Sequence, residues 1–228
     1  MLTVAQSRPT ERAQFIQKTY LHLAGAVGAF IAIEFLLFFT GIAEAITGFV
    51  ASSRFTWLAI LGGFTLLGWL ARSLAAKADS VQTQYTGLAI YVVAQALIFA
   101  PLLYIAAVFS DPSVIPTAGI LTLLLFAGLT TVAFTTKKDF SFLGGILTIG
   151  GFIALGLILC SVIFGFTLGL IFSVVMVAFA SIAILYDTSK VMHHYATHQH
   201  VAASLELFAS VALLFWYVLQ VVMSMSRR

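Results

Sequence analysis

Three carboxylates lie inside long apolar stretches of this 228-residue chain: Glu34, Asp187 and Glu206. An ionisable group in a membrane-spanning segment costs about 2.5–3.5 kcal/mol on insertion scales, so each one needs a reason to be there. Asp187 precedes a short polar loop and Glu206 follows it, so both should lie at a similar depth. Arg72 ends an earlier apolar stretch at the same side. The pattern predicts a proton-sensitive lock, in which an ionised acid holds Arg72 and protonation releases it.

A purely structural reading of the same residues stays open. Asp187 can pair with Lys190 one helical turn later, while Glu206 and Arg72 extend their charged ends to water. Glu34 lies in the middle of the first apolar stretch without an obvious partner. We expect it either beside a polar cavity or protonated.

The loop at 193–200 holds four of the five histidines. His194 lies two turns beyond Asp187 on the same helical face, which favours a contribution to pH sensing. The histidine spacing matches no zinc template, so we expect no metal site. The chain contains no GxSxG, HExxH or Walker motif, and the sequence does not predict an enzyme.

The composition identifies the environment of these residues. Hydrophobic residues make up 61% of the chain and charged residues 8%, whereas a soluble domain carries about 25% charge. This excludes a soluble enzyme, a nucleic-acid binder, a disordered regulator and a secreted disulfide scaffold. The single cysteine, Cys160, lies in an apolar run and is expected to be a packing residue. The chain is therefore predicted to be a polytopic protein of the lipid bilayer.

Seven apolar stretches reach the roughly 20 residues that a spanning helix needs. The uncharged run at 142–190 is too long for one crossing, so we expect a turn at 165–169, although its GxxxG spacing also suits close helix packing. The prediction is an all-α membrane protein, a seven-transmembrane helical bundle, with a cytosolic tail at 1–20, a membrane domain at 21–223 and a short tail at 224–228. The predicted spans are approximately 21–41, 55–73, 86–109, 115–135, 142–164, 167–190 and 201–223.

The distribution of positive charge predicts the orientation. With seven spans and the N-terminus inside, eight of the 11 Lys and Arg residues fall on the cytoplasmic side. The other side holds Arg54, Arg227 and Arg228. We therefore expect the N-terminus inside and the C-terminus outside. A six-span arrangement with a re-entrant last segment is the alternative, since it would move the terminal arginine pair inside.

Three stretches together resemble the Bax inhibitor-1 (YccA-like) family of multi-pass membrane proteins. The first is Thr-Lys-Lys-Asp-Phe-Ser-Phe-Leu-Gly-Gly at 136–145, and the second is Ile-Leu-Tyr-Asp-Thr at 184–188. The third is the final apolar stretch, with Leu214-Phe215 and Val218-Leu219-Gln220. The resemblance implies a seven-helix bundle whose last helix is central. It also implies a pH-sensitive calcium leak in some bacterial members, suppression of cell death in eukaryotic members, and modulation of the membrane protease FtsH in the YccA branch.

Only part of the pH sensor of the leak-type family members is matched in this sequence. In leak-type members two aspartates act with an arginine. Asp187 matches the first aspartate and Arg72 lies close to the position of the arginine, but Ser210 stands where the second aspartate would be. Glu206 lies one turn earlier and could form a shifted version of the pair.

Two functions are therefore expected. The first is a modulator of FtsH in the bacterial cytoplasmic (inner) membrane, which Ser210 favours, with the segment 1–20 as its contact. The alternative is a pH-gated passive calcium leak channel closed by Asp187, Glu206 and Arg72. Calcium would then be the transported ion, and no other cofactor and no nucleic acid is expected. The sequence predicts no particular oligomeric state.

Overall fold

The structure, a computed structural model, describes residues 3–77, 80–136 and 138–226, without the side chain of Arg54. Over these residues it is built of helices, which confirms the predicted all-α class. Seven helices are long and apolar enough to cross a membrane, as predicted. In chain order the elements are η1 (Val4–Gln6), α1 (Pro9–Phe39), α2 (Ile42–Ala51), α3 (Arg54–Ala75), α4 (Val81–Phe109), α5 (Val114–Thr136), α6 (Leu143–Phe164), α7 (Gly169–His193) and α8 (His200–Ser226).

The turn expected between the fifth and sixth spans is present. α6 ends at Phe164 and α7 begins at Gly169. Gly165 and Gly169 have φ angles of +75° and +69°, a left-handed conformation that glycine adopts without steric cost. Two glycines thus allow the long uncharged run to reverse direction.

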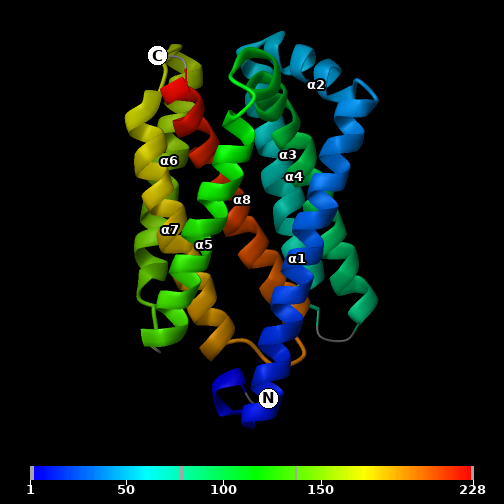
Figure 1. Cartoon of the computed structure of the whole chain (residues 1–228), viewed down its shortest axis with the longest axis vertical. Coiled ribbons are helices and arrows are strands. Elements are labelled where there is room, and N and C mark those ends of the chain that lie inside the picture. The colour runs from blue at the N-terminus through cyan, green and yellow to red at the C-terminus, as the bar shows by residue number, and fades with distance from the viewer. Residues whose placement is uncertain (1–2, 78–79, 137, 227–228) are drawn as a thin grey trace.

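The short helix α2 was not predicted from the sequence. It follows Gly41, whose φ is +76°, and has 10 residues, about half the length of a membrane span. It lies between α1 and α3 at the end of the bundle where α1 ends (Figure 1). A search for apolar stretches of about 20 residues passes over a helix of this length.

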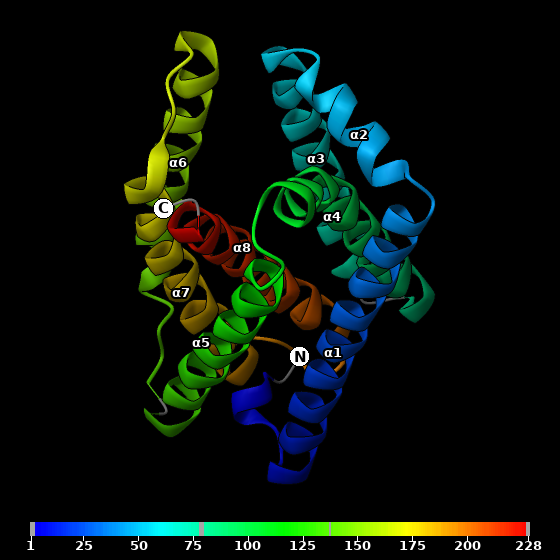
Figure 2. The same ribbon diagram turned by 45° about the horizontal axis from the view of Figure 1, so that its top comes forward.

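α8 runs through the middle of the bundle, as expected for the last helix (Figures 1 and 2). It packs against α1, α3, α4, α5 and α7, and most of its side chains are buried. α6 lies at the periphery, with Ala154 as its one buried residue in the described chain. Residues on α8 therefore face several other helices at once.

The beginning of the chain folds back onto the loop between α7 and α8. The Val4 amide donates a 2.8 Å hydrogen bond to the Tyr195 carbonyl, and Thr3 forms an antiparallel bridge with Ala196. The Val4 side chain is fully buried, and the Phe15 ring lies 6.5 Å from that of Tyr195. Much of the segment expected as a tail is thus ordered, and α1 already begins at Pro9. We call the end of the bundle that carries these contacts the N-terminal end.

Candidate functional site

A cavity of about 790 Å³ lies between α3, α4, α6, α7 and α8. At the N-terminal end of the bundle it is lined by Arg72, Asp187 and Glu206, and at the other end by the turn at 166–169. Its lining on α3 runs from Trp57 to Arg72, which lie fifteen positions and therefore about 22 Å apart along the helix. The cavity therefore extends through much of the thickness of the bundle.

Arg72 and Glu206 form an ion pair across the cavity. The Arg72 Nε lies 3.1 Å from both carboxylate oxygens of Glu206. The Arg72 guanidinium also lies over the ring of Tyr91 on α4, 5.3 Å from its centroid, a cation–π contact. These contacts link α3, α4 and α8 at the position where the sequence predicted a lock.

A close approach of α3 and α4 places this arginine. A Cβ atom added to Gly87 would lie 2.5 Å from the Ala71 carbonyl oxygen and 2.7 Å from the Ala75 amide nitrogen. Glycine at position 87 thus lets the two backbones touch one turn before Tyr91. Because this contact fixes α3 against α4, it holds Arg72 over the Tyr91 ring.

Asp187 and Ser210 form the second polar contact of the site. The Ser210 hydroxyl donates a 2.5 Å hydrogen bond to the Asp187 carboxylate. Both side chains are buried, with 8% and 7% of their surface exposed. The contact joins α7 to the central helix α8.

The two acids have separate partners, because Glu206 binds Arg72 while Asp187 accepts from Ser210. The structural reading in which Asp187 pairs with Lys190 differs from the observed contacts. The Lys190 ammonium lies over the rings of Tyr186 and Tyr195, 5.2 Å and 5.6 Å from their centroids.

Burial and the negative charges of Glu206 and Asp187 raise the pKa of the Tyr195 phenol. The charges of Glu206 and Asp187 therefore act on the α7–α8 loop, which the N-terminal segment covers.

Glu34 lies away from this cavity. It is buried on the face of α1 that also carries Phe30 and Leu37, with 7% of its surface exposed. Neither of its carboxylate oxygens has a hydrogen-bond partner among the described residues. The structure does not bring it together with the other predicted site residues.

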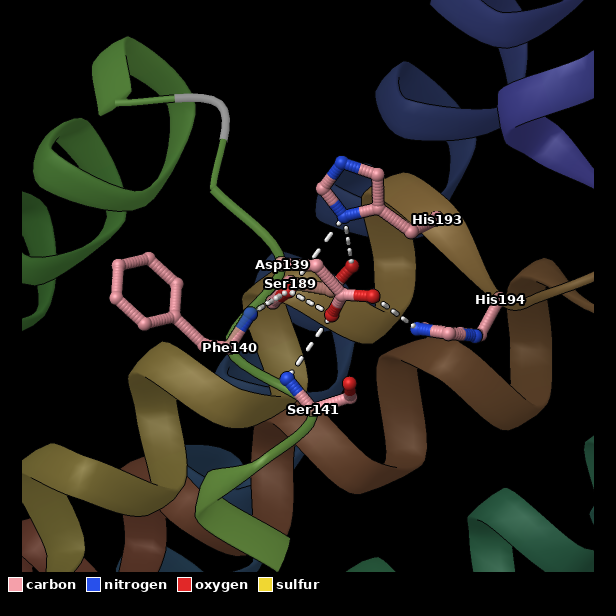
Figure 3. Close-up of polar contacts among 6 residues, drawn as sticks. All are labelled: Asp139, Phe140, Ser141, Ser189, His193 and His194. Atoms are coloured by element: carbon pink, nitrogen blue, oxygen red, sulfur yellow. Dashed lines mark hydrogen bonds and ion pairs between the residues drawn. The ribbon is translucent and has the colours of Figure 1, made fainter.

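His194 belongs to a second polar cluster, shown in Figure 3. Its Nε2 lies 3.1 Å from a carboxylate oxygen of Asp139, in the loop between α5 and α6, and not beside Asp187. The other oxygen of Asp139 accepts hydrogen bonds from the Ser141 amide at 2.9 Å and the Ser189 hydroxyl at 3.3 Å (Figure 3). The Ser189 hydroxyl in turn accepts from the Phe140 amide at 2.9 Å. The cluster ties the α5–α6 loop to the end of α7.

Hydrogen bonding stabilises the charged form of Asp139. The Ser141 amide is the main cause, with smaller contributions from the Ser141 hydroxyl and His194, and together they hold the pKa of Asp139 below its ordinary value. The carboxylate is therefore the acceptor that organises the cluster.

Sequence reasoning did not identify Tyr91, Asp139 or Ser189. Tyr91 lies one turn after Gly87, and a glycine inside a long apolar helix is a usable signal of a close helix contact. Asp139 and Ser141 form a local Asx turn, but the contact to Ser189 spans 50 positions and carries no local pattern. Within the described residues no three His, Cys, Asp or Glu side chains are close enough to hold a metal ion.

Comparison with known proteins agrees with the resemblance of the motifs. Residues 12–228 match the family described as "Inhibitor of apoptosis-promoting Bax1". An uncharacterized protein of Pseudomonas aeruginosa is 40% identical over 110 residues, which are 48% of this chain and 49% of that protein. The Golgi anti-apoptotic protein of vaccinia virus (strain Lister) is 33% identical over 117 residues, 49% of this chain and 48% of the relative. The matches to these curated relatives thus span about half of their length. Because the family match covers nearly all of the sequence, the chain belongs to the Bax inhibitor-1 family of integral membrane proteins.

Proposed function

We propose that the protein is a passive cation pathway of the bacterial cytoplasmic membrane, closed by the Arg72–Glu206 pair and by Asp187, with calcium as the transported ion. The observation that carries the proposal is the cavity, because it extends about 22 Å along α3 from this pair towards the opposite end of the bundle. Arg72, Asp187 and Glu206 are its only charged lining residues in the described chain. These three side chains thus set the charge at one end of the pathway.

Protonation is the expected trigger. Its expected site is Asp187, which is buried and whose hydrogen-bond partner is a neutral hydroxyl. The ionised form of Asp187 accepts the Ser210 bond that holds α7 to α8, beside the Arg72–Glu206 pair that holds α8 to α3. Acidification should therefore loosen α7 from α8 and increase flux.

Calcium flux into proteoliposomes at pH 6, 7 and 8 tests this function. Wild type should conduct faster at pH 6 than at pH 8. Glu206→Gln breaks the ion pair with Arg72 and should conduct faster than wild type at pH 8. Asp187→Asn should flatten the pH dependence. Asp111→Asn is the control, since Asp111 lies in the exposed α4–α5 loop outside the cavity. Flux no faster than in empty liposomes at every pH would refute the proposal.

A second function, modulation of FtsH, is favoured by the N-terminal part of α1. Its first turns expose Glu11, Gln14, Gln17 and Lys18, while Phe15 is buried against the bundle. This leaves an ordered polar surface at the end of the protein for a partner.

Reversing the charges of Glu11 and Lys18 should reduce co-purification with FtsH, and changing the exposed Lys77 at the same end should not. Equal recovery of FtsH with all three proteins would refute this surface.

The orientation that we propose has the N-terminus inside and the C-terminus outside. It is supported by the excess of Lys and Arg that seven spans place on the inner side. Three of the counted residues, Lys137, Arg227 and Arg228, lie outside the described part of the structure. A reporter fused after the C-terminus should be active only outside the cytoplasm, and cytoplasmic activity would refute the orientation.

A further inference from the structure

We propose that the cavity between α3, α4, α6, α7 and α8 is a binding site for lipophilic organic cations that carry aromatic rings. The size of the cavity suits such a ligand. At about 790 Å³ it lies within the range of about 300–1,000 Å³ of sites that hold drug-sized ligands. Such sites are lined mainly by apolar and aromatic side chains, with a few polar groups that fix the ligand.

The charge of the lining favours a cation. Glu206 neutralises Arg72, with both of its oxygens 3.1 Å from the Arg72 Nε. Asp187 has no basic partner within ion-pair distance among the described residues, and its observed partner is the neutral Ser210 hydroxyl. With all three groups ionised, the lining carries one net negative charge, and that charge is located at Asp187.

The aromatic residues of the lining suit an organic cation that carries rings. Trp57 on α3 and Trp216 on α8 face each other with ring centroids 6.0 Å apart and planes inclined by 17°. Both line the cavity, together with Phe64, Tyr91, Tyr186 and Tyr217. The faces of such rings attract cations that have shed their water, and their area matches the apolar part of an aromatic ligand.

The position of the acids relative to the rings sets the shape of the ligand. Asp187 lies at the N-terminal end of the cavity, and the Trp57–Trp216 pair lies towards the other end, with Phe64 between them along α3. A ligand therefore needs apolar rings extending from its charged centre. This inference requires the cavity and its charge but not ion flux, so it stands independently of both functions proposed above.

Equilibrium dialysis of the purified full-length protein in detergent at pH 8 tests the site, with radiolabelled tetraphenylphosphonium as the probe and protein-free micelles as the blank. Tetraphenylborate has the same shape and the opposite charge, so it separates recognition of charge from partition into the micelle. We expect saturable binding of one tetraphenylphosphonium per chain and no saturable binding of tetraphenylborate.

Two variants and a matched control connect the binding to the cavity. Asp187→Asn should weaken tetraphenylphosphonium binding about tenfold, and Trp57→Leu should weaken it by a similar factor through loss of a ring face. Asp139→Asn removes the same charge from an exposed loop outside the cavity and should leave the affinity unchanged. Trp57→Leu retains the Asp187–Ser210 contact, so it tests the site even where Asp187→Asn impairs folding.

Four results would overturn the proposal. They are the absence of saturable tetraphenylphosphonium binding, equal binding of tetraphenylborate, an equal loss of affinity in Asp139→Asn and Asp187→Asn, and unchanged affinity in a folded Trp57→Leu protein. None of these four results depends on a flux measurement. A failure of the leak experiment can therefore be distinguished from a failure of the binding experiment.

Discussion

Ser210 on the central helix donates a hydrogen bond to Asp187 on α7, at the position where the resemblance to leak-type family members implies a second aspartate. Two aspartates at this distance would have to share a proton or repel each other. A serine instead offers a neutral donor, which suits an ionised Asp187. The acid that the sequence proposed as a substitute, Glu206, is bound to Arg72. The polar contacts of α8 are thus divided between two helices.

Replacing Ser210 by alanine should lower the stability of the protein. The substitution leaves a buried carboxylate without its donor, which costs about 1–3 kcal/mol. Ser204→Ala is the control, because Ser204 is equally buried on α8 but donates to the Val201 carbonyl of its own helix. Thermal unfolding in detergent should show a clearly lower midpoint for Ser210→Ala than for Ser204→Ala. Equal midpoints would mean that the bond to Asp187 does not stabilise the bundle.

Gly87→Ala should disturb both the fold and the arginine. An added Cβ meets the α3 backbone at 2.5–2.7 Å, so the helices must separate, at a cost of about 1–3 kcal/mol. Gly128→Ala on α5 is the matched control, since an added Cβ there has no neighbour within 4 Å. The Gly87 variant should unfold at a lower temperature than wild type, and the Gly128 variant should not. Two unchanged midpoints would show that α3 and α4 can move apart freely.

The apolar runs of the sequence predicted the helices well, because a membrane span needs a length of apolar residues that few other structures share. The turn at 165–169 followed from the excess length of one run. The charges, by contrast, predicted only the depth of Arg72, Asp187 and Glu206. Which acid binds the arginine depends on how α3 and α8 are rotated about their axes, and the sequence contains no local signal for that rotation.

The beginning of the chain shows another limit of sequence reasoning. Its polar residues suggested a tail, but one apolar side chain, Val4, is fully buried beside the α7–α8 loop. A single buried residue in a polar segment has no periodicity to reveal it. The contact to Tyr195 joins residues that are nearly the whole chain apart, so only the folded structure brings them together.

The contact between the N-terminal segment and the α7–α8 loop predicts a cross-link. Residues opposite each other in an antiparallel bridge have Cα atoms about 4.5–5.5 Å apart, which suits a disulfide. Thr3→Cys with Ala196→Cys, in a Cys160→Ser background, should therefore form an intramolecular disulfide on mild oxidation. Gln14→Cys with Ala196→Cys is the control, because Gln14 lies on the exposed side of α1. Equal cross-linking of the two pairs, read by mass spectrometry, would contradict the observed bridge.

The α5–α6 loop should be held to α7 at neutral pH and released by acid. The pKa of Asp139 is lower in the folded protein than its ordinary value of 3.8, so its contribution to stability is fully present above that value. It is lost as the pH falls through the lower, folded value. The Phe140 and Ser141 amides, which donate into this cluster, should stay protected from hydrogen exchange between pH 7 and 5, after correction for intrinsic rates.

Asp139→Asn should remove this protection already at pH 7, because an amide oxygen is a weaker acceptor than a carboxylate. Asp111→Asn is the matched control, since the Asp111 carboxylate accepts from the Ser113 amide in the same two-residue turn but contacts no other helix. It should increase exchange at Ser113 and leave Phe140 and Ser141 as protected as in wild type. Unchanged protection of Phe140 in Asp139→Asn would mean that Ser189 alone holds the loop, and that the carboxylate contributes only a local turn.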